Sequence, residues 1–287
     1  MNPITGPAIV NISGGRSSAL MLRLLLDACD GALPPDVVPV FANTGEEAEG
    51  TLIFVREIAE RWNAPIRWIE FAPPRGDAPH EDVSRWREVD YCTASRHGEP
   101  FDALIDWKKY LPNPTQRLCT EWLKVRAALG FAISLGFPFH RERDAHGKLS
   151  TVGDFDQFLG IRADEPRRIG KNRTKPNVEL PLVDTGVTRG MVLDFWRAQP
   201  FDLHVRAGEG NCRLCFEKGI PQLRNVIREA PDEAGIDRWI AREERVGAVM
   251  KKGHSYTSIA AAARRQLPIF DIAPEPDADH LPCACGD

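Results

Sequence analysis

Residues 13–18, Ser-Gly-Gly-Arg-Ser-Ser, have the composition of a phosphate-binding loop. The apolar run at 8–12 predicts a buried strand before them, and leucines at helical spacing follow them. Glycines let the backbone approach a phosphate, and the N–H groups of a first helical turn point toward an anion bound there. The serines would add hydroxyl donors and Arg16 a charged one. The alternative is a strand-to-helix turn that binds no ligand.

A second polar group, Asn43-Thr44-Gly45-Glu46, ends the next predicted strand, over residues 35–45. An amphipathic helix over 48–62 and a strand over 66–71 follow it. Strands that alternate with helices at this spacing predict a parallel sheet with right-handed crossovers. Ligands of such sheets lie beyond the carboxyl ends of the strands, where both polar groups fall. We expect the irregular residues 72–118 to form a lid or substrate loop.

The composition is that of an ordinary globular protein. The chain has 287 residues, of which 43% are hydrophobic and 27% charged, with a formal net charge of −4. No apolar run reaches the roughly 18 residues that span a bilayer, and the first residues lack the features of a secretory signal. We therefore expect a cytoplasmic protein without membrane contacts. The net charge argues against indiscriminate nucleic-acid binding.

Four sequence motifs occur together in one order along the chain. They are the Ser-Gly-Gly loop, Ala42-Asn43-Thr44-Gly45-Glu46, Cys119-Thr120 with Leu123-Lys124, and Gly160-Ile161-Arg162-Ala163-Asp164-Glu165. A weaker fifth comprises Thr188, Phe195-Trp196 and Pro200-Phe201-Asp202-Leu203. With these motifs the chain resembles the PAPS reductase-like branch of the PP-loop ATP pyrophosphatase superfamily. The resemblance covers about residues 8–220.

The resemblance implies a Rossmann-like α/β fold of the adenine nucleotide α-hydrolase type, with a parallel sheet and helices on both faces. It also implies that ATP and Mg²⁺ bind at the carboxyl edge of the sheet. Along the chain we expect a PP-loop nucleotide-binding domain over 1–205, a helical region with cysteines over 206–273, and an acidic tail with Cys-x-Cys over 274–287.

The resemblance also assigns site residues. Ser13, Gly14, Gly15, Ser17 and Ser18 would hold phosphate, and Asn43, Thr44, Gly45 and Glu46 would line the adenosine or a metal. Lys124 and Arg162 would offset phosphate charge, and Asp164 or Glu165 would hold Mg²⁺. Alternatively, Lys124 is a solvated helix residue, and the two carboxylates only pair with Arg167 and Arg168.

The cysteines suggest a metal. Cys212 and Cys215 form a Cys-x-x-Cys that can bind a metal or one edge of a cluster. The resemblance makes Cys119 a third ligand, and Cys283, Cys285, Cys92 or an open position would complete the set. A [4Fe–4S] cluster is the first interpretation; zinc and a redox or structural thiol pair are the alternatives.

The chain departs from its relatives in ways that affect the predicted function. Arg16-Ser17 stand where ATP-using members often carry Lys-Asp, and the Glu-Cys-Gly-Ile/Leu-His motif of PAPS reductases is missing. The leading hypothesis is therefore an ATP-dependent enzyme that adenylates a nucleotide or nucleic acid for sulfur transfer. A sulfonucleotide reductase and a non-catalytic nucleotide-binding module are the alternatives.

The same hypothesis names partners. We expect the protein to bind an adenine nucleotide and to use tRNA or DNA as the acceptor. We also expect a sulfur donor such as a cysteine desulfurase, and a homodimer. The basic run of Arg162, Arg167, Arg168, Lys171, Arg173 and Lys175 fits either a nucleic-acid backbone or a solvated loop.

Overall fold

Six strands of the computed structural model form one sheet, in the order β4-β3-β2-β1-β7-β8. The structure describes residues 4–73, 85–143, 147, 149–206, 209–210 and 212–265. The strands are β1 (Ala8–Ile12), β2 (Val37–Asn43), β3 (Arg67–Ala72), β4 (Arg85–Val89), β7 (Asp156–Leu159) and β8 (Val178–Glu179). All neighbours pair in parallel except β3 and β4. The predicted α/β architecture with a mostly parallel sheet is confirmed.

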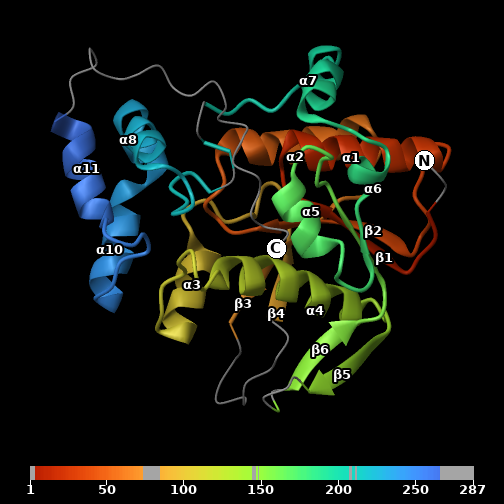
Figure 1. The fold of residues 1–287 in the computed structure, drawn as a ribbon, viewed down its shortest axis with the longest axis horizontal. Coiled ribbons are helices and arrows are strands. Elements are labelled where there is room, and N and C mark those ends of the chain that lie inside the picture. Colours follow the sequence, from red (N-terminus) through yellow and green to blue (C-terminus); the bar gives the residue numbers. More distant parts are fainter. Residues whose placement is uncertain are drawn as a thin grey trace.

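Helices cover both faces of this sheet (Figure 1). The helices of this part are α1 (Arg16–Ala28), α2 (Glu49–Arg61), α3 (Glu99–Lys108), α4 (Arg126–Ser134), α5 (Pro166–Asn172) and α6 (Pro181–Asp184). A further helix, α7 (Arg189–Arg197), contacts α1 and lies outside the layer of α1 and α2 (Figure 1). Successive strand residues point to opposite faces. Val10 therefore packs in the core that contains α1 and α2 residues, whereas Ile9 packs in the core that contains α4 residues.

The C-terminal helices lie beside the sheet, on the left of Figure 1, and form a second hydrophobic core. They are α8 (Ile220–Glu229), α9 (Pro231–Ala234), α10 (Ile236–Val246) and α11 (Tyr256–Arg265). Their core includes Leu223, Trp239 and Ile259, and it is shared with Phe101 of α3 and Trp122. The helical region is thus packed against elements that precede it in sequence by more than a hundred residues.

Residues 72–118 contain more regular structure than the sequence predicts. Within the described part of this segment lie the strand β4 and the helix α3. The strand is short and polar, with two of its five residues exposed, because it lies at an edge of the sheet and pairs antiparallel to β3. The expected lid is therefore partly an edge strand and a packed helix. Alternation of apolar residues is weak in such a strand, which explains why the sequence pattern misses it.

The third sequence motif lies in a π-helix, η1 (Cys119–Val125), which continues as α4. Such i→i+5 turns are rare in proteins and are frequent at functional sites. The segment contacts both β2 and β3. It therefore brings Cys119 and Lys124 toward the sheet in an unusual register.

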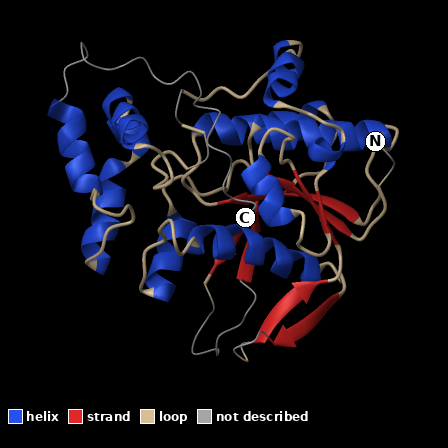
Figure 2. Cartoon of the chain, viewed as in Figure 1, coloured by secondary structure: helices blue, strands red, loops and turns tan. Residues whose placement is uncertain are grey.

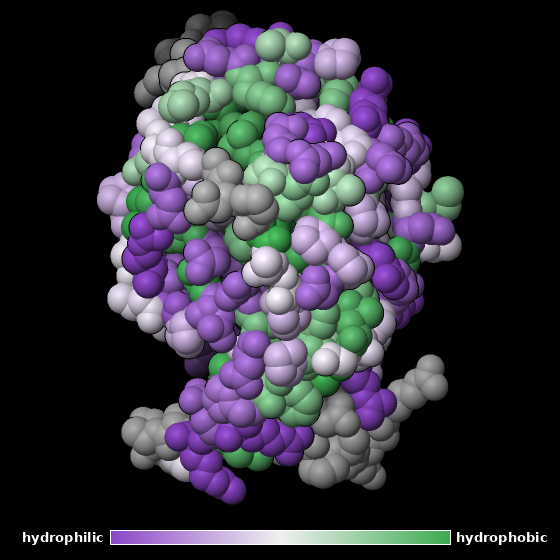
Figure 3. Space-filling view, turned by 90° about the vertical axis from the view of Figure 1, so that its right-hand side faces the viewer, coloured by the Kyte–Doolittle hydropathy of each residue, from purple (hydrophilic) through white to green (hydrophobic). Residues whose placement is uncertain are grey.

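A hairpin of β5 (Phe139–Arg143) and β6 (Leu149–Gly153) extends at the lower right of Figure 2, away from the C-terminal helices. All five residues of β5 are exposed. Figure 3 shows hydrophilic side chains gathered over this lower end of the surface. Among the described residues, no helix combines the length and apolar character that crossing a membrane requires.

Candidate functional site

The strand order predicts a crevice for ligands at the carboxyl ends of β1 and β7. The chain passes from β1 through β2 to β3 on one side, and then returns to place β7 on the other side of β1. Ligands of parallel sheets bind at such a switch point, where the connections from neighbouring strands run in opposite directions. The loop of residues 13–18 leaves β1 here, and residues 160–165 leave β7. Two of the four sequence motifs therefore meet.

These two loops are in close contact at Gly160. A Cβ atom at that position would lie 2.6 Å from the Cα of Ser18 and 2.9 Å from its nitrogen. Only a residue without a side chain lets the β7 loop approach the start of α1 so closely. The glycine of the fourth motif thus has a packing role that the sequence alone does not disclose.

The loop after β1 is held in shape by its own serines. The hydroxyl of Ser18 accepts a hydrogen bond from the Ser13 backbone at 3.1 Å and donates to the Gly15 carbonyl at 3.0 Å. The two serine hydroxyls are also 3.0 Å apart. Gly14 has φ of +79°, which residues with a side chain rarely adopt. Ser13 and Ser18 therefore build the loop, and Gly15 is the N-cap of α1.

Arg16 has a different environment from the one that the sequence suggests. Its guanidinium makes a bidentate pair with Asp202, at 2.7 and 2.9 Å, and donates to the Leu203 carbonyl at 3.1 Å. The indole of Trp196 donates to the Arg16 carbonyl. The residue therefore ties the start of α1 to the weak fifth motif. This pairing favours an anchoring role for Arg16 over the predicted phosphate contact.

Arg162 is the cation that faces the loop after β1. It donates to the Ser17 hydroxyl at 3.3 Å and to Asp164 at 2.9 Å. Partial burial acts to raise the pKa of Asp164, but hydrogen bonds from the Arg189 backbone and from Arg162 lower it. An anionic carboxylate thus lies beside the guanidinium that reaches Ser17.

Glu165 is engaged by its own turn. Its carboxylate accepts from the Arg162 backbone at 2.9 Å and pairs with Arg168 at 2.8 Å. The alternative that the two carboxylates pair with Arg167 and Arg168 thus describes Glu165, which pairs with Arg168. Asp164 instead pairs with Arg162.

At the carboxyl end of β2, Asn43 is buried and shapes the backbone. Its amide donates to the buried carboxylate of Glu70 at 2.6 Å and to the Ser95 carbonyl at 2.9 Å. Its side-chain oxygen accepts from the Gly45 backbone at 3.2 Å. These bonds fix the turn in which Gly45 takes φ of +78°. Asn43 and Gly45 therefore position the residues that follow.

Glu47, which the sequence analysis does not single out, is the carboxylate that lies beside Lys124. The lysine nitrogen is 3.7 Å from the Glu47 carboxylate. The same carboxylate accepts from the backbone and hydroxyl of Thr44, at 3.0 and 2.8 Å. The Glu47 side chain is 2% exposed and that of Lys124 is 14% exposed. Lys124 is therefore not a solvated helix residue.

Glu46 points away from this group, into the C-terminal helices. Its carboxylate lies 2.7 Å from Arg242 and accepts from the indole of Trp239 at 3.1 Å. Burial raises the pKa of Glu46, although Arg242 acts to lower it. Arg242 stays charged because it also pairs with Asp102 at 2.9 Å. Glu46 thus connects α10 to the loop after β2, and nothing in the local sequence indicates these distant partners.

The Cys-x-x-Cys loop lies against the same turn. The Cys212 sulfur is 3.5 Å from the Thr44 hydroxyl, and Cys212 forms a β-bridge with Glu47. The backbone of Arg213 donates to the Glu46 carbonyl at 3.0 Å. Cys212 is buried and Cys215 is half-buried. The structure thus brings the cysteine motif to the loop that follows β2.

Three side chains donate hydrogen bonds to carbonyl groups of this cysteine loop. Lys218 donates to the Arg213 carbonyl, the Tyr256 hydroxyl to Leu214, and Lys251 to Phe216. Burial lowers the pKa of Lys218 to about 8, although Cys215, Cys212 and Glu209 act to raise it. Three side chains thus bind carbonyl groups of the loop, and one of them is a buried lysine close to both thiols.

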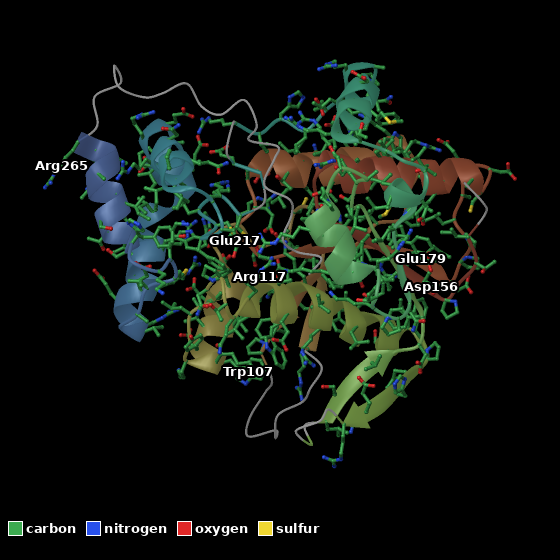
Figure 4. The ribbon with its side chains drawn as sticks, viewed as in Figure 1. Trp107, Arg117, Asp156, Glu179, Glu217 and Arg265 are labelled. Atoms are coloured by element: carbon green, nitrogen blue, oxygen red, sulfur yellow. The ribbon has the colours of Figure 1, made fainter. Side chains whose placement is uncertain are left out.

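The remaining cysteine predictions have mixed outcomes. Cys119 begins η1 and packs against the core that contains Leu214 and Phe216 of the cysteine loop. Within the described ranges, no three His, Cys, Asp or Glu side chains group as a metal site requires. Cys283 and Cys285 lie outside the described residues. In Figure 4, Arg117 before η1 and Glu217 of the cysteine loop mark this region, between the sheet and the C-terminal helices.

Comparisons with known proteins give a relative without an assigned activity. The chain is 29% identical over 269 residues to a phage lambda protein described as "Uncharacterized nin region protein ORF290". The match spans 92% of this chain and 83% of that protein. No family model and no solved structure matches the chain. The similarity therefore covers both the sheet and the C-terminal helices.

Proposed function

We propose that the protein is an ATP-dependent enzyme of the PP-loop type, which adenylates a nucleotide or nucleic-acid acceptor for sulfur transfer. The observation that supports this most is the crevice between β1 and β7. There a serine-glycine loop opens a helix, and Arg162 reaches the hydroxyl of Ser17. A helix N-terminus beside a guanidinium is suited to bind the phosphates of a nucleotide.

In the proposed reaction, an oxygen of the acceptor attacks the α-phosphorus of ATP. The P–O bond to the β-phosphate breaks, and pyrophosphate leaves into the loop of residues 13–18. A sulfur nucleophile supplied by a donor protein then forms a C–S bond, and AMP leaves with the acceptor oxygen. Arg162 and Lys124 would offset the negative charge that develops on the phosphates. Asp164 would help to hold Mg²⁺, which accepts one or two carboxylates together with phosphate oxygens.

The cysteine loop would serve the sulfur-transfer half of the reaction. Cys212 lies beside Thr44. Thr44 is in the loop that follows β2, the strand next to β1. Cys212 and Cys215 offer two thiols, whereas a [4Fe–4S] cluster or a structural zinc takes four ligands. The described residues, Cys119 included, group no third ligand with them. A bound cluster would therefore draw its further ligands from outside the described residues, where the C-terminal Cys-x-Cys lies.

Titration of the purified protein with Mg-ATP tests the proposal. Arg162→Gln removes the guanidinium beside Ser17, and Lys252→Gln removes an exposed cation on the C-terminal side. A charge-assisted hydrogen bond contributes about 1.5–3 kcal/mol, so we expect Arg162→Gln to weaken ATP binding at least about tenfold. Lys252→Gln should bind ATP as the wild type does. Equal ATP affinity of all three proteins, or no ATP binding by the wild type, would contradict the proposal.

Product analysis separates the alternatives. Pyrophosphate release that depends on an acceptor supports adenylation. Sulfite formation from a sulfonucleotide with a thiol reductant would instead identify a reductase, and nucleotide binding with neither product would identify a non-catalytic module. Iron and zinc analysis of anaerobically purified wild-type and Cys212→Ala protein decides whether the cysteine motif holds a metal.

A further inference from the structure

Glu47 is a buried carboxylate to which the proposed reaction gives no role. Its side chain is 2% exposed, and a buried charge is unfavourable unless hydrogen bonds and an opposite charge compensate it. Thr44 supplies hydrogen bonds to this carboxylate, and Lys124 supplies an opposite charge. Glu47 therefore links the turn that follows β2 to η1.

The carboxylate of Glu47 is fixed by its own turn. One of its oxygens accepts a hydrogen bond from the Thr44 backbone at 3.0 Å, and both oxygens accept from the Thr44 hydroxyl, at 2.9 and 2.8 Å. A β-bridge with Cys212 holds the Glu47 backbone. None of these contacts involves Lys124, so they set the place of the anion independently of the lysine.

Lys124 is the more flexible partner of the pair. Its four-carbon side chain loses rotamer entropy when it is ordered. The lysine nitrogen lies 3.7 Å from the Glu47 carboxylate, which is farther than an ordinary hydrogen bond. The pair is therefore held by attraction between charges, which is strengthened by the burial of the carboxylate. A fixed anion thus restricts the positions of a flexible cation.

The adjacent carboxylate, Glu46, does not share this role. It lies 2.7 Å from Arg242 and accepts a hydrogen bond from the indole of Trp239 at 3.1 Å. Both partners belong to α10, among the C-terminal helices. Glu47 is therefore the carboxylate of this turn that pairs with the lysine of η1.

The pair lies at the edge of the sheet that carries the proposed nucleotide site. Ile12 of β1 pairs with Phe41 of β2, and neighbouring strands are about 5 Å apart. The loop of residues 13–18 and the turn at Thr44 therefore leave adjacent strands at one edge. Lys124 reaches this edge because η1 contacts β2 and β3.

We infer that Glu47 is a positioning residue, which holds the Lys124 ammonium in place for the phosphates of ATP. A side chain that is already ordered loses less entropy when a ligand binds to it. Glu47 therefore assists ATP binding through the lysine, although its own charge repels the nucleotide. This inference rests on the proposed function, and it adds to that function a residue that acts through Lys124.

A cycle of substitutions tests the inference, with Mg-ATP as the ligand. It compares the wild type, Glu47→Gln, Lys124→Gln and the variant that carries both changes. Glu243→Gln is the matched control, because Glu243 is also buried and accepts hydrogen bonds from backbone N–H groups, those of Met250 and Tyr256. Calorimetric titration measures the Kd of each protein for Mg-ATP, and urea denaturation shows whether each variant is folded.

The expected effect of Glu47→Gln depends on the lysine. Lys124→Gln removes a charge-assisted contact and should weaken ATP binding at least about tenfold. Glu47→Gln releases the lysine, which must then be ordered when ATP binds, and should weaken binding at least about threefold. When Lys124 is already replaced, the same change only removes a negative charge, so ATP should bind equally or more tightly. Glu243→Gln should bind ATP as the wild type does.

Unchanged or tighter ATP binding by Glu47→Gln would overturn the inference, because Glu47 would then only neutralise the lysine. Equal weakening with and without Lys124 would also overturn it, as would an equal loss in Glu243→Gln. If Glu47→Gln does not fold, Glu47→Asp replaces it in the cycle. That change keeps the charge and withdraws the carboxylate by one methylene, and it too should weaken ATP binding only when Lys124 is present.

The same titrations keep the two proposals apart. A wild type that does not bind Mg-ATP refutes the proposed function. A wild type that binds Mg-ATP, together with a Glu47→Gln variant that binds it at least as tightly, refutes the inference about Glu47 alone.

Discussion

Substitution of Gly160 by alanine tests whether the crevice depends on the close approach of its two loops. The added Cβ would lie 2.6 Å from the Cα of Ser18, and ordinary contact begins near 3.4 Å. The atoms it meets are backbone atoms at the start of α1, which cannot rotate away as the end of a side chain would. The two loops must therefore separate by about 0.8 Å.

The expected magnitude follows from this displacement. Overpacking of a close contact destabilises a fold by about 1–3 kcal/mol. Gly170, in the interior of α5, offers a matched control because a Cβ there meets nothing within 4 Å. Alanine in that helical position should stabilise the fold by about 0.5–1 kcal/mol. The two glycine variants should therefore differ by about 1.5–4 kcal/mol in their free energy of unfolding.

Urea denaturation measures the stabilities, and pyrophosphate release measures the site. A misplacement of about 1 Å can lower a rate about a hundredfold, so Gly160→Ala should release pyrophosphate far more slowly than Gly170→Ala. Identical stability of the two variants would refute the packing argument. A destabilised Gly160→Ala with full activity would show that the loops do not form the site.

Three further predictions concern Arg16 with its partner Asp202, Gly14 and Asp102. Arg16→Gln and Asp202→Asn should each lower the unfolding free energy by about 1–2 kcal/mol. Titration should show that the ATP affinity of each variant changes less than about threefold. A larger loss of affinity in Arg16→Gln would indicate that Arg16 contacts a phosphate. Gly14→Ala should abolish ATP binding in the same assay, because its φ is +79° and its Cβ would meet Thr51 at 2.4 Å; wild-type affinity would contradict this. The pKa of Asp102 lies below 3.8, since Arg242 and Arg245 outweigh the effect of its burial. Its contribution to stability is therefore complete above about pH 3.8 and is lost as the pH falls through the lowered value. Asp102→Asn should be less stable at neutral pH and lose less stability on acidification; urea midpoints that fall in parallel for both proteins would contradict this.

The sheet and its first two crossover helices could be predicted because their residues repeat locally. Apolar runs and helical spacing depend on neighbours in sequence, and the predicted strand at 66–71 differs by one residue at each end from β3. The two polar motifs were placed at strand ends for the same reason. The loop after β1 meets Arg162 because β7 lies beside β1 in the sheet.

The partners of individual side chains could not be predicted, because they lie far away along the chain. Glu46 and Glu47 are adjacent and similar in sequence, yet one pairs with Arg242 and the other lies beside Lys124. The difference arises because successive residues of the turn point in opposite directions. Arg16 is a comparable case, since Asp202 lies 186 residues away. Such pairings depend on the packing of whole elements and leave no local pattern.

The π-helix η1 has a consequence for the comparison of related sequences. An extra residue within a helical turn shifts every later side chain around the axis by about 100°. A relative with one residue fewer between Cys119 and Val125 could wind this stretch as an ordinary helix. It would then turn a neighbour of Lys124, and not the lysine, toward Glu47. An alignment of such proteins should therefore place a gap in this stretch so that residues on the same side of the helix are matched. Matching the lysines by position in the sequence alone would equate residues that face different surroundings.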